Sequence, residues 1–141
     1  MNNVEAREWL TAYVSRETMD RFELYHDMLL RWQRTINLVA PSTLPDAWTR
    51  HFVDSAQLFD LAPRNATRWL DLGSGGGFPG LIVATMALEA RPKLSVTLVE
   101  SDVRKCGFMR EAARAMGVNV NILTQRISEI PKQSADVVTD T

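Results

Sequence analysis

Cysteine and histidine are scarce in this chain, and their scarcity excludes two kinds of site. Cys106 is the only cysteine, so neither an internal disulfide nor a cysteine-rich metal site is possible. The two histidines, His26 and His51, are too few and too widely separated to predict a zinc site. We therefore expect a protein without a metal ion.

An excess of charge and a long apolar run are lacking as well. The chain has 16 basic and 17 acidic side chains, so its composition gives no overall electrostatic argument for binding nucleic acid. Its longest apolar run, from Leu81, is much shorter than the roughly 20 residues of a membrane span. The first residues lack the basic start and apolar core of a signal peptide. These absences favour a cytoplasmic protein without membrane contact, on which a basic surface could arise only by folding.

The patterns that are present indicate one globular unit, a monomer, built from two parts. With 141 residues, 45% of them hydrophobic, the chain is long enough for one domain with its own core. In residues 1–63 apolar side chains recur at steps of three and four, which predicts an N-terminal helical extension. Two prolines in Asn37–Pro45 predict a loop there, and a third helix is expected from Asp46 to near Pro63.

Residues 64–141 instead alternate short β-branched stretches with helical ones. The expected strands are Trp69–Leu72, Leu94–Glu100, Val118–Leu123 and a fourth that begins at Asp136–Thr139. The expected helices are Gly77–Ala90 and Asp102–Met116. Strands that alternate with helices predict an α/β fold with a parallel sheet.

A glycine-rich turn follows the first expected strand and indicates a ligand site. A nucleoside-triphosphate loop would end in Gly-Lys-Ser/Thr, but here Gly77 is followed by Phe78. The dinucleotide fingerprint fails when it is counted from Gly73, yet it matches formally at Gly75, Gly77 and Gly80. An NAD-type dinucleotide-binding oxidoreductase is therefore the first alternative function.

The same turn also fits the methyl donor S-adenosylmethionine. α/β methyltransferases carry Asp-x-Gly-x-Gly-x-Gly after the first strand, and Asp71, Gly73, Gly75 and Gly77 match it. A second acid at the end of the next strand would hold the ribose hydroxyls, because a carboxylate accepts several hydrogen bonds. Glu100 occupies that position, although a strand-end acid on the surface is the alternative interpretation. The following Ser101-Asp102 pair is expected to cap the next helix.

The chain resembles the bacterial small-subunit ribosomal RNA methyltransferases that modify guanine N7, also called glucose-inhibited division protein B. The resemblance extends over nearly the whole chain, and Gly-Phe-Pro-Gly at the end of the glycine turn is its most specific part. The residues that carry it are Trp32, Ile36–Leu38, His51–Ser55, Leu70–Gly80, Leu98–Ser101, Arg104, Lys105, Phe108, Arg126, Ser128 and Glu129.

The resemblance implies a Rossmann-like, class I S-adenosylmethionine-dependent methyltransferase with an N-terminal helical extension. It implies methyl transfer to N7 of a guanine in 16S ribosomal RNA, with ribosomal RNA or the small ribosomal subunit as partner. By position, the donor would contact the residues of its family motifs. These are Gly73, Phe78, Glu100 with the adjacent Ser101, and the backbone of Ile127 and Ser128.

The resemblance also implies that the C-terminal part of such a domain is missing. Family members carry an arginine in a Ser-Arg-Ala segment after the fourth strand, and Thr141 fills its position here. A truncated, non-catalytic module that binds the donor or RNA is therefore the second alternative function.

A few further side chains are candidates for contact with RNA. Arg104, Lys105 and Arg126 could meet phosphates, although a solvated helix face is the ordinary interpretation of the first two. His51 could contact RNA or tie the helical extension to the α/β part. No general base is expected, because guanine N7 carries a free lone pair and the sulfonium methyl is already activated.

Overall fold

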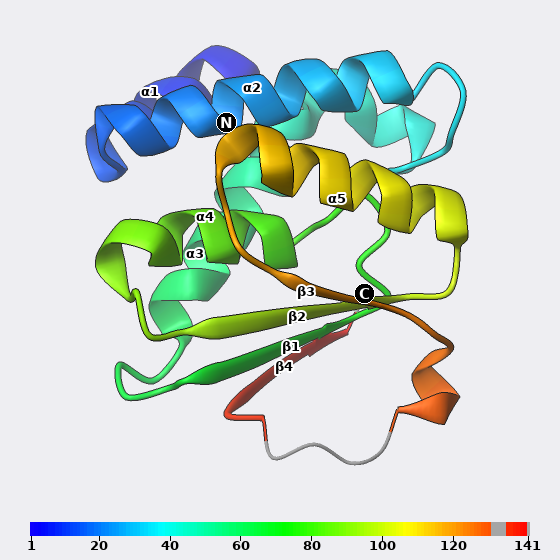
Figure 1. Ribbon diagram of the computed structural model, residues 1–141. Helices are drawn as coiled ribbons and strands as arrows, with labels where there is room; N and C mark the ends of the chain where they lie inside the picture. Colours follow the sequence, from blue (N-terminus) through cyan, green and yellow to red (C-terminus); the bar gives the residue numbers. More distant parts are fainter. Residues whose placement is uncertain (131–134, 141) are drawn as a thin grey trace.

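The computed structural model describes residues 1–130 and 135–140, which form a parallel sheet covered by helices (Figure 1). The strands are β1 (Arg68–Leu72), β2 (Ser95–Glu100), β3 (Asn121–Thr124) and β4 (Val137–Asp140). Their order in the sheet is β3-β2-β1-β4, and every neighbouring pair is parallel. The predicted parallel α/β sheet is therefore confirmed.

Two helices connect these strands, α4 (Gly80–Ala90) and α5 (Val103–Met116). The prediction that α4 begins at Gly77 is wrong by three residues, because Gly77 has a φ of 100° and cannot continue a right-handed helix. Asp102 caps α5 as predicted: its side chain accepts hydrogen bonds from the backbone of Arg104 and Lys105. Gly117 ends α5 in the left-handed conformation.

The N-terminal part is helical, as its apolar periodicity predicts. It contains α1 (Asn3–Tyr13), α2 (Arg16–Trp32) and α3 (Asp54–Leu61), which a π-helical segment precedes at Trp48–Val53. The predicted loop is only partly correct, because Pro41–Asp46 forms a 3-10 helix. Prolines suit such short turns, since the first residues of a helix have no internal acceptor for their N–H groups.

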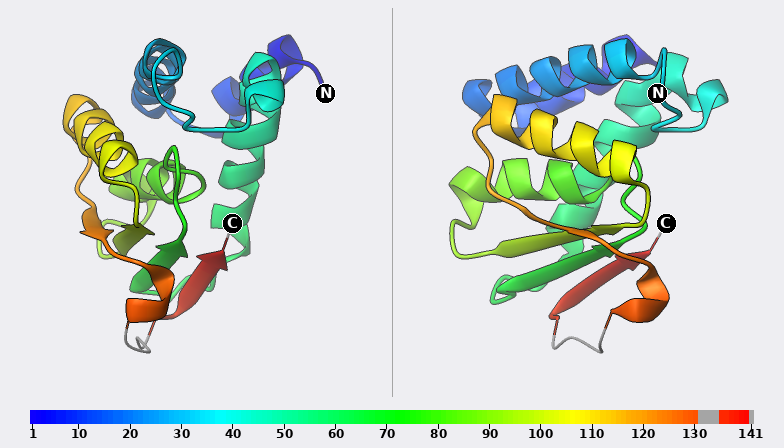
Figure 2. Two further views of the ribbon diagram at one scale, coloured as in Figure 1. Left: turned by 90° about the vertical axis from the view of Figure 1, so that its right-hand side faces the viewer. Right: turned by 45° about the vertical axis from the view of Figure 1, so that its right-hand side comes forward.

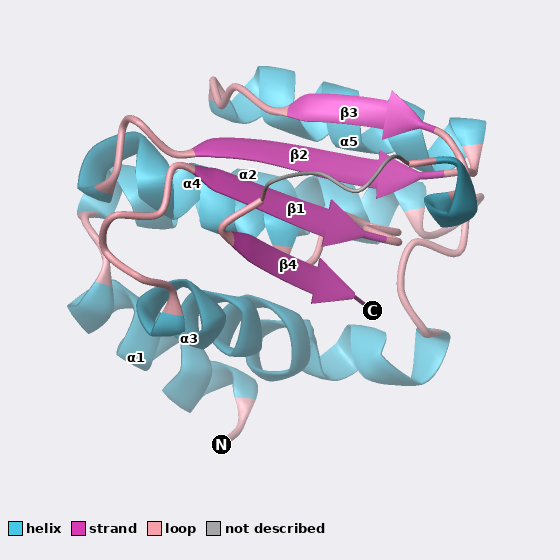
Figure 3. Cartoon of the chain, turned by 90° about the horizontal axis from the view of Figure 1, so that it is seen from below, coloured by secondary structure: helices cyan, strands magenta, loops and turns pink. Residues whose placement is uncertain are grey.

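The helices lie in layers on one face of the sheet. Figure 2 shows α4 and α5 against the strands, with α1 and α2 farther from the sheet. Figure 3 looks onto the opposite face, where no α-helix lies over the strands within residues 1–130 and 135–140. A shallow hollow on that face is lined by Leu70, Thr97 and Asn121.

One apolar core joins the N-terminal helices to the α/β part. Tyr25 of α2 packs against three phenylalanines, with ring centroids 5.4 Å from Phe52, 5.0 Å from Phe78 and 6.2 Å from Phe108. Burial of such large rings supplies most of the stabilisation at this junction.

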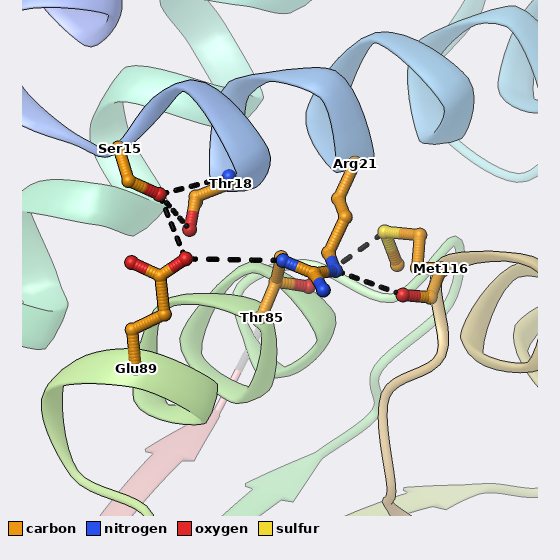
Figure 4. A network of polar contacts seen from close by, with 6 residues as sticks. All are labelled: Ser15, Thr18, Arg21, Thr85, Glu89 and Met116. Atoms are coloured by element: carbon orange, nitrogen blue, oxygen red, sulfur yellow. Dashed lines mark hydrogen bonds and ion pairs between the residues drawn. The ribbon is translucent and has the colours of Figure 1, made fainter.

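Polar contacts add to this packing where α2 crosses α4 and α5 (Figure 4). Arg21 of α2 donates from Nε to the carbonyl oxygen of Met116, at a distance of 3.0 Å. Ser15, which caps α2, donates to Glu89 of α4 at 2.8 Å, and Arg21 lies 3.9 Å from the same carboxylate. Such partly exposed ion pairs stabilise a fold by less than about 1 kcal/mol, so their main effect is to orient α2.

Candidate functional site

Asp71 is fully buried at the carboxyl end of β1, and its side chain fixes the start of α4. Its Oδ2 accepts a hydrogen bond from the backbone of Gly80 at 3.0 Å. Its Oδ1 accepts from the hydroxyl of Thr139, at 3.0 Å on the neighbouring β4, and that hydroxyl accepts from Trp69 Nε1. The carboxylate therefore faces the protein interior and ties β1, β4 and α4 together.

Burial raises the pKa of the Asp71 carboxyl to about 6. Hydrogen bonds from Gly80, Thr139 and Ser74 oppose this rise, because they stabilise the charged form. The position of the carboxylate at the N-terminus of α4 is also one where a negative charge is favoured.

The glycine turn leaves β1 beside β2 and then bends sharply toward α4. The backbone of Gly73 donates to the carbonyl oxygen of Val99 at 2.8 Å, so the turn begins at the carboxyl end of β2. Gly73, Gly75 and Gly77 have φ angles of 73°, 54° and 100°, a region that L-residues with a side chain rarely adopt. The structure thus brings the three predicted glycines together in one turn.

Glu100, at the end of β2, is bonded directly to this turn. Its Oε1 accepts from the backbone of Gly75 at 2.9 Å, and its Oε2 accepts from the backbone of Asp102 at 2.9 Å. The side chain is partly exposed, and both of its oxygens are hydrogen-bonded to the backbone. A carboxylate has about four acceptor positions, so two remain for hydroxyl groups of a ligand.

Phe78 leaves the turn in the opposite direction and enters the core. Phe78 is 7% exposed, and its ring stacks on that of Tyr25. The centroids of the Phe78 and His51 rings are 4.9 Å apart. The peptide bond from Phe78 to Pro79 is cis. The ring therefore attaches the turn to the helical extension, and the backbone of Phe78 is the part that borders the turn.

His51 lies beside Phe78 and is half-buried. Its Nε2 is 2.8 Å from the hydroxyl of Thr43, so these two side chains share a hydrogen bond. Burial lowers the pKa of His51 and the nearby Arg50 lowers it further, whereas Asp54 raises it. The imidazole is consequently neutral at pH 7.

The remaining candidates lie at the same edge of the sheet, which Figure 3 shows at the arrowheads of β2 and β3. Ile127 and Ser128 are exposed in a 3-10 helix, Ile127–Glu129, that follows β3. The backbone of Gln125 donates to the carbonyl oxygen of Glu100 at 3.1 Å and so holds this segment next to the acid.

The basic candidates flank this edge. Arg104 and Lys105 lie in the first turn of α5, and Arg126 directly precedes the 3-10 helix. Arg104 is exposed and donates to the carbonyl oxygen of Thr35 at 3.3 Å, which places its guanidinium beside the end of α2. Thr141, at the position of the family's Ser-Arg-Ala arginine, lies outside the described residues.

The described residues hold neither a cluster of metal ligands nor a membrane-spanning helix. Among residues 1–130 and 135–140, no three histidine, cysteine, aspartate or glutamate side chains lie close enough to hold a metal ion. Within the same part of the chain, no helix is long and apolar enough to cross a membrane.

Sequence reasoning missed two residues that support the site, Tyr25 on α2 and Thr139 on β4. Tyr25 shows in the sequence only as one of the apolar side chains that recur at helical spacing, yet its hydroxyl donates to the carbonyl oxygen of Gly76 at 2.6 Å. Thr139 was noted only as part of a strand, although it bridges Trp69 and Asp71. Neither residue belongs to a local motif, because its partner lies more than fifty positions away in the chain.

Comparison with known proteins identifies the family. A family profile described as rRNA small subunit methyltransferase G matches residues 18–140. The chain belongs to this family. Its members include the ribosomal RNA small subunit methyltransferase G of Jannaschia sp. (strain CCS1), which is 65% identical over 138 residues, 98% of this chain. The protein of the same name from Ruegeria sp. (strain TM1040) is 48% identical over 134 residues, 95% of this chain.

The chain spans 65% of the length of each of these two methyltransferase G relatives. Solved structures with low sequence identity share the fold alone. A protein-L-isoaspartate O-methyltransferase superimposes with a TM-score of 0.53 and 14% identity, over 99% of this chain and 47% of that one. A second such methyltransferase, from Plasmodium falciparum in complex with S-adenosyl-L-homocysteine, superimposes with a TM-score of 0.51 and 15% identity. The match covers 94% of this chain and 66% of that one. The predicted family and Rossmann-like class I methyltransferase fold are therefore confirmed.

Proposed function

We propose that this chain binds S-adenosylmethionine at the glycine turn and is the donor-binding part of an enzyme that methylates 16S ribosomal RNA. The acceptor is N7 of a guanine, in ribosomal RNA or in the small ribosomal subunit, and the enzyme acts in the cytoplasm. The observation that carries the proposal is the hydrogen bond between Gly75 and Glu100, which unites the two halves of a donor site. Membership of the methyltransferase G family supports the choice of substrate.

The residues at this edge fit the donor. Gly73, Gly75 and Gly77 present backbone without side chains, so a ligand can approach the turn closely. Glu100 and the adjacent Ser101 would hold the ribose hydroxyls, since the carboxylate retains free acceptor positions. The backbone of the exposed residues Ile127 and Ser128 would border the donor, with the backbone of Phe78 on the side of the turn. Asp71 would support the site indirectly, through the hydrogen bond that holds Gly80 at the start of α4.

The bound donor supplies an activated methyl group on a sulfonium. The chain's own residues then have to orient that group and the base, because guanine N7 already carries a free lone pair and loses no proton. Arg104 and Lys105, at the start of α5, and Arg126, before the 3-10 helix, would neutralise RNA phosphates, and His51 is held neutral beside Phe78. We assign these four residues to the RNA side of the site.

This assignment divides the chain functionally at residue 63. Residues 64–141 would bind the donor, and residues 1–63 would form a helical extension that packs with them as one unit. The continuous aromatic cluster around Tyr25 supports a single unit, since separating the parts would expose it to water.

Two measurements test the proposed function. Calorimetry with S-adenosylmethionine and with NAD should show binding of the methyl donor only, and tight NAD binding without a response to the donor would refute the proposal. Mass spectrometry of ribosomal RNA incubated with the chain and the donor should reveal 7-methylguanosine. Donor binding without RNA methylation would instead identify a non-catalytic donor-binding module, which the 65% coverage of the relatives makes a specific alternative.

A further inference from the structure

The glycine turn contacts the helical extension as closely as it contacts the sheet. Tyr25 of α2 is fully buried, and its hydroxyl donates to the carbonyl oxygen of Gly76 at 2.6 Å. Its ring lies nearly parallel to that of Phe78, with centroids 5.0 Å apart. Burial raises the pKa of the Tyr25 hydroxyl well above its ordinary value, and the charge of Asp71 adds to this rise, so the hydroxyl remains a donor. One side chain of α2 thus contacts the turn at two places, Gly76 and Phe78.

The backbone of Leu38 presses against the same turn. A Cβ atom on Gly76 would lie 2.9 Å from the carbonyl oxygen of Leu38 and 3.1 Å from its Cβ. A Cβ atom on Gly75 would lie 3.4 Å from that oxygen. Gly76 does not have a positive φ, so close contact rather than backbone conformation requires glycine at this position.

Gln33, at the end of α2, sets the position of Leu38. Its side-chain oxygen accepts from the backbone of Leu38 at 3.0 Å and of Val39 at 3.2 Å. Its amide nitrogen donates to the carbonyl oxygen of Val39 at 2.9 Å. Three hydrogen bonds from one carboxamide therefore fix the segment that rests on the glycine turn.

We propose that Tyr25 and Gln33 are positioning residues of the donor site, through which α2 holds the glycine turn in its ligand-binding conformation. Glu100 holds Gly75 from the side of the sheet, and α2 holds Gly75 and Gly76 from the opposite side. A turn released on one side populates other conformations, and a ligand that selects one of several conformations binds more weakly. The inference rests on the proposed function, since it assigns these residues to the binding of S-adenosylmethionine.

The test compares two variants with two matched controls. Tyr25→Phe removes the hydroxyl and keeps the stacked ring, and Thr18→Val removes a different buried hydroxyl from the same helix. Gln33→Met removes the carboxamide, and Gln57→Met makes the same exchange on an exposed position of α3. Calorimetry should show S-adenosylmethionine affinity reduced about threefold to tenfold in each of the two variants, the loss expected for one or two net hydrogen bonds. The controls should bind the donor as the unaltered chain does.

Circular dichroism and urea unfolding, done in parallel, separate positioning from stability. A purely structural role predicts that donor affinity remains unchanged wherever the protein is folded, although Thr18→Val and Tyr25→Phe both lower the urea midpoint. Amide hydrogen exchange of the unliganded protein should be faster at Gly75–Gly77 in Tyr25→Phe and Gln33→Met than in either control.

The outcomes distinguish this inference from the proposed function. If the unaltered chain binds S-adenosylmethionine and both folded variants bind it within twofold, the positioning role is refuted and the proposed function stands. If the unaltered chain binds no donor, the proposed function fails and the role in donor binding fails with it. Unchanged exchange rates at Gly75–Gly77 in both variants would refute the claim that contact with α2 stabilises the turn.

Discussion

Replacement of Gly80 by alanine should destabilise the fold sharply, because this residue lies where α4 meets the sheet. A Cβ atom on Gly80 would lie 2.0 Å from Leu98 Cδ2 and 2.7 Å from Asp71 Oδ2. Overpacking of this kind costs about 1–3 kcal/mol. Displacement of the Asp71 carboxylate would also weaken its hydrogen bond to the Gly80 backbone, and a bond to a charged group contributes about 1.5–3 kcal/mol. We expect Gly80→Ala to lower the free energy of unfolding by about 2–5 kcal/mol.

Gly107 in the interior of α5 provides the matched control. A Cβ atom there would meet no atom within 4 Å, so Gly107→Ala should instead stabilise the protein by up to about 1 kcal/mol through helix propensity. Urea unfolding followed by tryptophan fluorescence measures both changes. If the free energy of unfolding of Gly80→Ala lies within about 0.5 kcal/mol of that of the unaltered chain, the close packing of Gly80 against Leu98 and Asp71 is refuted.

Three other perturbations have defined outcomes. The folded-state pKa of Asp71, about 6, exceeds the unfolded value, so its contribution to stability is present at low pH and is lost as the pH rises from about 4 to 6. The difference in unfolding free energy between the unaltered chain and Asp71→Asn should therefore fall over this window, by an amount on the order of 2–3 kcal/mol in urea titrations, and a pH-independent difference would refute the shift. Arg104→Ala should weaken binding to a ribosomal RNA fragment and reduce the salt slope by about 1, whereas Arg114→Ala, at the other end of α5, should change neither in filter-binding assays. Gly75→Val should abolish donor binding in calorimetry, because φ is 54° and the added side chain would meet Leu38; normal binding by the folded variant would remove Gly75 from the site.

The sequence predicted the α/β part well because its patterns are local. The first four residues of strand β2, Ser-Val-Thr-Leu, alternate between polar and apolar side chains, as expected of a strand. Its neighbours β1 and β3 lie on either side of it in parallel, as the alternation of strands and helices along the chain requires. The cap at Asp102 is a one-residue signal and is confirmed, and the predicted end of α5 at Met116 is confirmed as well. The start of α4 was misplaced, because helical propensity gave no indication that the turn extends through Gly77.

The candidate site was only partly accessible to sequence reasoning. The sequence assigned Gly75 and Glu100 to one donor site, and the structure places the Glu100 carboxylate 2.9 Å from the Gly75 nitrogen. Their roles toward the donor stay predictions. Contacts such as Tyr25 with Gly76 depend on how α2 packs across α4 and α5, and no local pattern encodes that packing. The direction of the Phe78 ring, toward the core, likewise follows from tertiary packing.

Donor binding by Glu100→Ala tests the central claim most directly. Glu100 accepts from Gly75 and would hold the donor ribose, whereas Glu111, on the exposed side of α5, pairs with the nearby Arg114. Calorimetry should show S-adenosylmethionine bound by the unaltered chain and by Glu111→Ala with equal affinity. For Glu100→Ala we expect an affinity at least about tenfold lower, with circular dichroism unchanged, since hydrogen bonds to a charged group are lost. Equal affinity in all three proteins would contradict the assignment of the donor site to this edge of the sheet.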